Sequence, residues 1–177
     1  MLVQLRPHIY FYNIPIQVHV AVANTIHWDL FNADPTLLVR VVSIKQIPDI
    51  VTAVTGAAFA WKLNRTTAVG VAGVAQTAVL PDLSQSALSA NVTCRSKPTS
   101  GATEGVILYN YTIHSEETNA GTIMLASLGG LELVPVNWSE DEVRRGILLR
   151  QNQGLSCVQI TNSAAGNTGW FLGFTVE

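Results

Sequence analysis

The chain has 177 residues, of which 48% are hydrophobic and only 12% are charged, and its formal net charge is −2. An average soluble domain carries roughly 25% charged residues, so this chain has few charges with which to keep a bare surface soluble. The ten Lys and Arg residues are scattered, which excludes a basic stripe for nucleic acid, and no apolar run reaches the ~18 residues that a transmembrane helix needs.

The N-terminal segment 1–26 is predicted to be an arm or the first strands, ahead of a single β-sandwich domain over 27–177. Between two prolines it carries four large apolar side chains in a row, Ile9, Tyr10, Phe11 and Tyr12. An uncovered arm of this kind would aggregate. Addition to the sheet edge of a neighbouring subunit would cover it, and so would pairing within the protein's own sheet; both arrangements stay open.

Strand patterns dominate the middle of the chain. Residues 14–22 alternate in a way that predicts one apolar face made of Ile16, Val18, Val20 and Val22. Residues 37–45 form a β-branched run, and residues 106–113 alternate again. The Ala-, Val-, Thr- and Gly-rich segment 52–80 fits either a flat strand or an extended loop.

The end of the chain is predicted to be a meander of three strands over 146–150, 155–161 and 169–176, separated by turns rich in Asn and Gly. The last strand has one apolar face, formed by Trp170, Leu172, Phe174 and Val176. A terminal strand this apolar must be laid into a sheet, either its own or a neighbour's. The candidate interface residues are therefore those of the two terminal apolar clusters, namely Ile9, Tyr10, Phe11, Tyr12, Trp170 and Phe171.

Helical signals are few. The spacing of Ser and Glu in Ser139–Glu142 is that of a capping box and predicts a short helix, and Pro81–Leu88, capped by Asp82, predicts another. Many short strands with Gly and Asn turns predict an all-β fold. Its expected form is a jelly-roll-like antiparallel sandwich with one or two short helices and an extended N-terminal arm.

Residues capable of chemistry are present, but their spacing does not favour an active site. His114, Ser115, Glu116 and Glu117 are adjacent, yet neighbours on a strand point to opposite faces, so an interface loop or polar turn is favoured. No spacing typical of metal ligands or of a phosphate-binding loop occurs, and neither a catalytic residue, a metal nor a cofactor is expected. Both cysteines, Cys94 and Cys157, are expected to be reduced thiols. Core packing is favoured over a sugar-binding platform for the tryptophans, which are Trp28, Trp61, Trp138 and Trp170.

Several long stretches carry a family resemblance, among them WKLNRTTAVG at 61–70, YTIHSEETNAGTIML at 111–125 and GILLRQNQGLSCVQITNSAAGNTGWFLGFTVE at 146–177. Over about Trp28–Glu177 the chain resembles small proteins encoded among the virion genes of tailed bacteriophages. The resemblance implies a β-rich structural subunit, either a capsid decoration or cement protein or another minor capsid protein. It also implies that no cofactor and no catalytic residue are present.

Together these observations predict a non-enzymatic structural virion protein, made in the host cytoplasm, that assembles through β-rich protein–protein contacts. The expected partners are further copies of the chain, in a trimer or a higher assembly, and a major capsid protein or other virion component. Neither nucleic acid nor a membrane is an expected partner. Two alternatives stay open: a self-assembling filament or tube subunit, and a carbohydrate-binding jelly-roll adhesion module.

Overall fold

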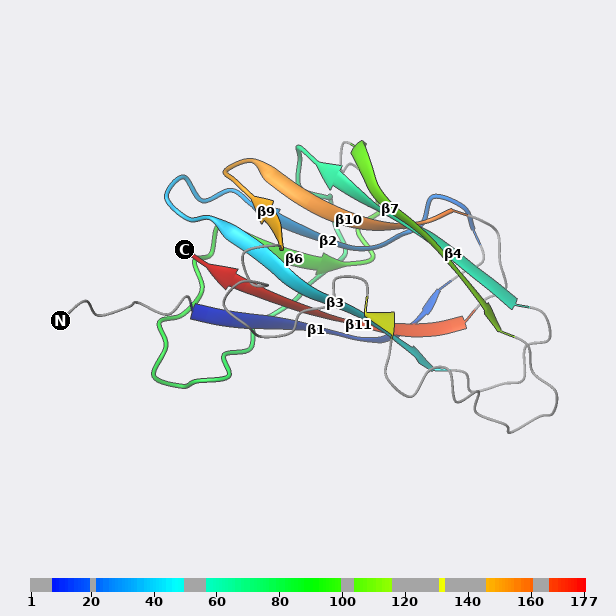
Figure 1. The fold of residues 1–177 in the computed structure, drawn as a ribbon, viewed down its shortest axis with the longest axis horizontal. Coiled ribbons are helices and arrows are strands. Elements are labelled where there is room, and N and C mark those ends of the chain that lie inside the picture. The colour runs from blue at the N-terminus through cyan, green and yellow to red at the C-terminus, as the bar shows by residue number, and fades with distance from the viewer. Residues whose placement is uncertain are drawn as a thin grey trace.

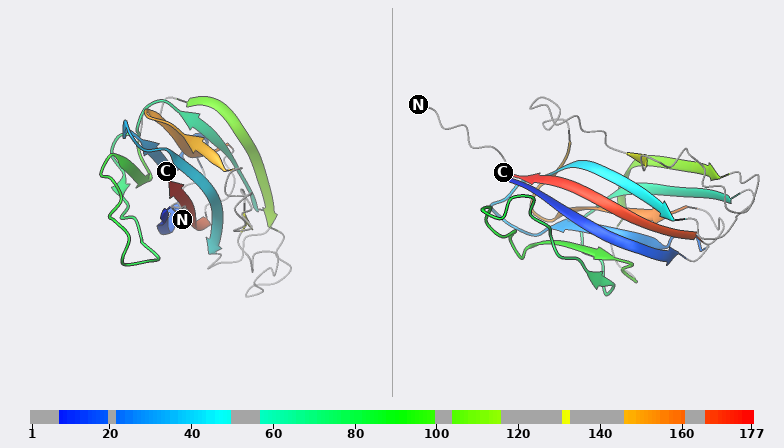
Figure 2. Two further views of the ribbon diagram at one scale, coloured as in Figure 1. Left: turned by 60° about the vertical axis from the view of Figure 1, so that its left-hand side comes forward. Right: turned by 90° about the horizontal axis from the view of Figure 1, so that it is seen from below.

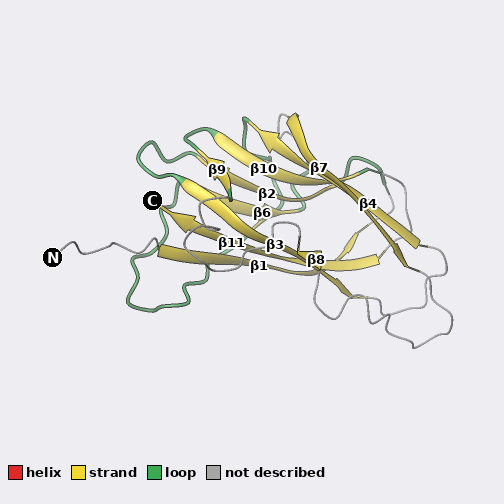
Figure 3. Cartoon of the chain, in the orientation of Figure 1, coloured by secondary structure: helices red, strands yellow, loops and turns green. Residues whose placement is uncertain are grey.

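The computed structural model describes residues 8–19, 22–49, 57–99, 104–115, 131–132, 146–160 and 166–177. Over these residues the chain forms strands and no helix (Figures 1 and 3). The strands are β1 (His8–His19), β2 (Ile26–Asn32), β3 (Val39–Asp49), β4 (Ala57–Thr66), β5 (Val74–Ala75), β6 (Val92–Ser96), β7 (Glu104–Ser115), β8 (Leu131–Glu132), β9 (Ile147–Leu149), β10 (Gln153–Gln159) and β11 (Gly166–Val176). The predicted all-β class is confirmed.

Two antiparallel sheets pack face to face as a sandwich (Figure 2). Sheet A has the order β1-β11-β3-β8, with β9 also paired to β3, and sheet B has the order β5-β6-β2-β10-β4-β7. The pairing is nested, because β1 pairs with β11, β2 with β10, β3 with β8 and β9, and β4 with β7. Strands β1 to β4 alternate between sheet A and sheet B. The later strands alternate in the reverse order, with β7 in sheet B, β8 and β9 in sheet A, β10 in sheet B and β11 in sheet A.

The core lies between the sheets and is built by the period-two alternation of their strands. In β11, Trp170, Leu172 and Phe174 are all at most 1% exposed, which confirms that the apolar face predicted for the last strand is laid into a sheet and buried. From sheet B, Trp28 and Trp61 meet Trp170 edge to face, with ring centroids 6.0 and 5.2 Å apart. Each fully buried side chain of this size contributes about 1.5–3 kcal/mol, so the closing strand is held firmly by its own chain.

The predicted apolar face of residues 14–22 is wrong for the two members whose side chains the structure describes. Ile16 is 47% exposed and Val22 is 55% exposed. The pairing of β1 with β11 shifts between Ile14 and Gln17, where the chain also contains Pro15. Proline has no N–H for the ladder, and an extra residue at a bulge reverses the alternation beyond it.

The short helix predicted over Pro81–Leu88 is also wrong. The Asp82 carboxylate accepts the backbone N–H and the hydroxyl of Ser84 at 2.8 and 2.7 Å, which closes a local turn. Leu83, the apolar residue of this turn, is 96% exposed, so a helix here would have no buried face to stabilise it. The other predicted helix begins at Ser139, which lies outside the described residues.

The N-terminal apolar cluster belongs to the protein's own sheet. Residues 9–12 lie within β1, which is hydrogen-bonded to β11 along its length. At Phe11 the other edge of β1 pairs with the long connection after β5: Phe11 N–H donates to Val79 O at 3.0 Å, and Val79 N–H donates to Phe11 O at 2.7 Å. The expected extended arm is therefore not found for His8–His19, which is part of the sandwich, and residues 1–7 lie outside the described chain.

The segment left open between strand and loop contains both. Ala57–Thr66 is strand β4, only Val74–Ala75 within the following stretch is a strand, and residues 52–56 lie outside the described chain. The connection crosses the outer face of sheet B, where Gly70 N–H donates to Asp29 Oδ2 at 2.6 Å. Arg95 Nη1–H donates to Gly70 O at 2.8 Å from the neighbouring strand, so both backbone polar groups of Gly70 are hydrogen-bonded to sheet B.

Candidate protein–protein interface

The six residues predicted to form an interface lie on two neighbouring strands of sheet A, the edge strand β1 and the strand β11 beside it. Strand β1 pairs with β11 so that Tyr12 lies opposite Leu172, Asn13 opposite Phe171, and Ile14 opposite Trp170. The structure thus brings the two terminal clusters together, although they are about 160 positions apart in the chain. The pleat then divides them between the two faces of the sheet.

Three of the six face inward and cannot touch a partner. Tyr10, Tyr12 and Trp170 are 4, 2 and 1% exposed, respectively. The two tyrosine rings stack on Phe174, with centroids 5.7 and 5.3 Å away. The prediction that these three are interface residues is therefore corrected: they are core residues, because alternate positions of a strand point to opposite faces.

The hydroxyl groups of the buried tyrosines explain how they are tolerated in the core. Tyr12 Oη–H donates to Val92 O and Tyr10 Oη–H donates to Ser86 O, each at 3.0 Å. Burial raises the pKa of both phenols above the ordinary value of 10.0. Each therefore remains a neutral donor that ties sheet A to the connection before β6 or to the start of β6.

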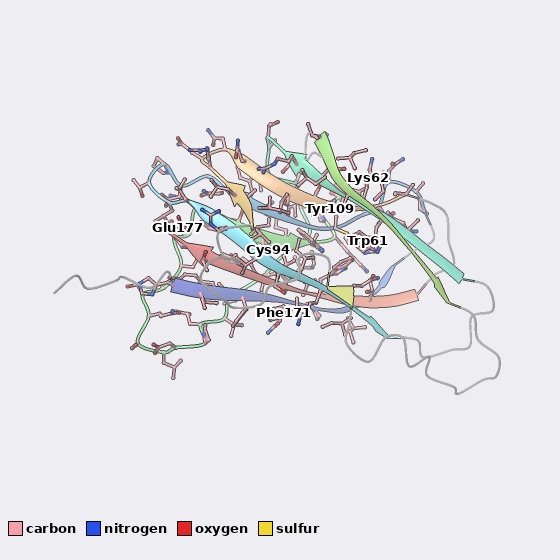
Figure 4. All side chains as sticks on the ribbon, viewed as in Figure 1. Trp61, Lys62, Cys94, Tyr109, Phe171 and Glu177 are labelled. Carbon is pink, nitrogen blue, oxygen red and sulfur yellow. The ribbon has the colours of Figure 1, made fainter. Side chains whose placement is uncertain are left out.

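The other three, Ile9, Phe11 and Phe171, form a half-exposed patch on the outer face of sheet A, called here the sheet A patch. Phe11 and Phe171 meet with ring centroids 4.9 Å apart and an interplanar angle of 36°. Figure 4 shows Phe171 on the side of sheet A that faces away from sheet B. These three side chains remain accessible, so their predicted place in an interface stays a prediction.

A second exposed apolar region lies on strand β7, and the sequence reasoning did not single it out. Val106, Ile107 and Tyr109 are 71, 49 and 50% exposed. β7 is the last strand of sheet B, and within the described residues only β4 pairs with it (Figure 2). We call the side of its backbone turned away from β4 the β7 edge.

The composition of β7 is the signal that could have identified it. The strand is 12 residues long, reads EGVILYNYTIHS, and contains no Lys, Arg or Pro. Soluble proteins usually protect an exposed edge with a charge, a proline or a covering loop. The apolar alternation alone could not reveal the edge, since a central strand shows the same pattern.

The described residues that were considered for chemistry lie on different strands. His114 and Ser115 end β7, while Glu116 and Glu117 lie outside the described residues. Cys94 and Cys157 are free and buried in β6 and β10, and burial raises the pKa of both thiols well above the usual value. Among the residues that the structure describes, no group of three His, Cys, Asp or Glu side chains could hold a metal ion.

Trp28, Trp61 and Trp170 are at most 1% exposed, which confirms their predicted place in the core, and Trp138 lies outside the described residues. Figure 4 shows Trp61 between the two sheets. The described part of the chain also contains no helix that is both long and apolar enough to cross a bilayer. No protein-family model matches the chain, and neither a curated protein nor a solved structure matches it significantly.

Proposed function

We propose that this chain is a non-enzymatic structural subunit of a virion, a capsid decoration or cement protein, that assembles through contacts between β-strands. The observation that carries the proposal is the β7 edge: a 12-residue strand, paired on one side within the described residues, with no cation and no proline. Among the strand side chains that the structure describes, Val106 is the most exposed large apolar residue, at 71%.

The contrast with the other long edge supports an assembly role. The outer edge of β1 is partly covered, because Phe11 exchanges two backbone hydrogen bonds with Val79 of the connection after β5. The β7 edge has no such cover among the described residues, although its length and apolar character make it the greater hazard. In a chain with only 12% charged residues, an edge left in this state is explained if a partner covers it during assembly.

The proposal includes a jelly-roll form for the sandwich. Nested pairing of the first strand with the last, the second with the second-last, and so on inward is the arrangement expected when one long antiparallel hairpin is rolled into two sheets. Jelly rolls occur in viral capsid and lectin domains. Fold alone does not specify function. The jelly-roll arrangement is therefore consistent with the proposal, which rests on the β7 edge.

A filament or tube subunit is the second candidate, and the same β7 edge favours it. The two candidates differ in symmetry, because a contact that closes gives a particle component and a head-to-tail contact that does not close gives a fibre. The carbohydrate-binding alternative has no comparable support, since Trp28, Trp61 and Trp170 are buried.

Assembly can be tested with two lysine variants of the full chain. Tyr109→Lys places a cation on the β7 edge, where Tyr109 is 50% exposed, and Val71→Lys places one on an exposed connection, where Val71 is 58% exposed. The wild type and V71K are expected to form concentration-dependent larger species in sedimentation velocity and to bind isolated capsids, whereas Y109K is expected to do both more weakly. A wild type that stays monomeric at high concentration and does not bind capsids would overturn the proposal.

A further inference from the structure

Strand β7 has an irregular half and a regular half. Its pairing with β4 shifts twice before Tyr109, at the steps from Thr66 to Asn64 and from Asn64 to Leu63. From Tyr109 to Ser115 the pairing is one to one, running against Leu63 to Ala57 without interruption. Bulges twist an edge away from further pairing, so the residues available to a new strand are the regular segment 109–115.

We infer that this segment pairs antiparallel with the same segment of a second copy of the chain, about a two-fold axis at Thr112. The inference rests on the proposed function and specifies its first contact. Sheet B, with its six strands, would continue directly into sheet B of the second copy. Such a contact is isologous and closed, so it gives a discrete pair and not an endless fibre.

The register follows from the geometry of antiparallel strands. Only alternate residues of an edge direct their N–H and C=O groups outward, so in a pair of identical strands a residue must meet one of the same parity. Centring the pair on Thr112 satisfies this rule and is the register that uses every residue from 109 to 115. Other allowed registers leave part of the regular segment unpaired or require pairing by the irregular residues before Tyr109.

Self-complementarity of the sequence YNYTIHS argues for a second copy as the occupant. In this register Tyr111 lies opposite Ile113 twice, and Thr112 lies opposite itself. Aromatic residues opposite β-branched ones, and Thr opposite Thr, are favourable cross-strand pairs. Asn110 lies opposite His114, and the segment contains no Asp, Glu, Lys or Arg that would meet its own copy.

Because Thr112 would lie opposite its own copy, charges at this position give a specific test. Thr112→Lys and Thr112→Glu each place like charges face to face, and each alone is expected to raise the dissociation constant of the pair about tenfold or more. An equimolar mixture of the two is expected to restore a heterodimer in sedimentation velocity. Thr77→Lys, at an exposed threonine of the connection after β5, is the matched control and is expected to behave as the wild type.

The outcomes separate this inference from the proposed function. If the wild type assembles while T112K and T112E assemble equally well, or if their mixture gives no rescue, the self-pairing is refuted and assembly stands. If the wild type does not assemble, both fail. Should either charged variant not fold, Thr112→Cys treated with a short bismaleimide gives the answer, because opposed Cβ atoms lie about 5 Å apart and Cys94 and Cys157 are buried. A T112C dimer linked at residue 112 supports the pairing, and its absence in an assembled sample refutes it.

Discussion

Lowering the pH from 7 to 4 is expected to destabilise the protein through His27. This side chain is 5% exposed, and its Nε2 lies 3.3 Å from Gln159 Oε1. Burial is the main reason that its pKa falls from 6.5 to about 4, and the positive charge of Lys97 lowers it further. The folded state therefore keeps the ring neutral over a range in which the unfolded chain takes up a proton.

The sign and size of the effect follow from this difference. A depressed pKa in the folded state gives a contribution that is complete above the unfolded pKa of 6.5 and is lost as the pH falls toward 4. At 1.36 kcal/mol per pKa unit, the free energy of unfolding should drop by about 3 kcal/mol over this window. Urea titrations followed by tryptophan fluorescence at pH 7, 5.5 and 4.5 measure it directly.

His27→Gln is the matched control, because it keeps an amide near Gln159 and cannot take up a proton. The H27Q variant is expected to be less stable than the wild type at pH 7 but nearly independent of pH between 6.5 and 4.5. The reasoning is refuted if the wild type shows no loss of stability in this window, or if H27Q shows the same loss.

Three further predictions concern the packing described above. Gly70→Ala should cost about 1–3 kcal/mol of stability, because the new Cβ would lie 2.7 Å from Asp29 Oδ2; an unchanged melting curve would contradict this contact. Leu172→Ala should cost about 2–5 kcal/mol, since Leu172 is 0% exposed, whereas Leu83→Ala, at a residue that is 96% exposed, should change the free energy of unfolding by less than about 0.5 kcal/mol; equal losses in urea titration would contradict the burial pattern. The two buried cysteine thiols should react with a thiol reagent only as fast as the protein unfolds, and rapid labelling of the native protein would contradict their burial.

Local patterns were sufficient to predict the fold class and the closing strand. The alternation around Trp170 and Phe174 predicted a face that is buried, because residues of β11 outside that face are mostly small or polar. The same reasoning could not tell which residues of the N-terminal cluster are buried and which are accessible. All residues from Ile9 to Tyr12 are large and apolar, so periodicity gave no indication of which ones face the core.

The position of the exposed edge was not predictable from local patterns at all. Val106 and Tyr109 belong to a segment whose alternation would suit a central strand equally well, and only the pairing of β4 with β10 on one side and β7 on the other makes β7 the last strand. The bulge near Pro15 was missed for a similar reason, since it depends on how β1 aligns with β11. Strand order and register are properties of the whole chain, formed by contacts distant in sequence.

Hydrogen exchange at β7 tests the central claim, that the β7 edge is the surface on which this protein assembles, more directly than any other measurement. Deuterium uptake of a peptide covering Glu104–Ser115 should be followed by mass spectrometry at low and at high protein concentration, together with a peptide from the connection at 76–91. The account predicts that uptake over Glu104–Ser115 slows as larger species form, because outward N–H groups gain partners, while uptake at 76–91 does not change. Larger species that form with no change in uptake at β7 would contradict it.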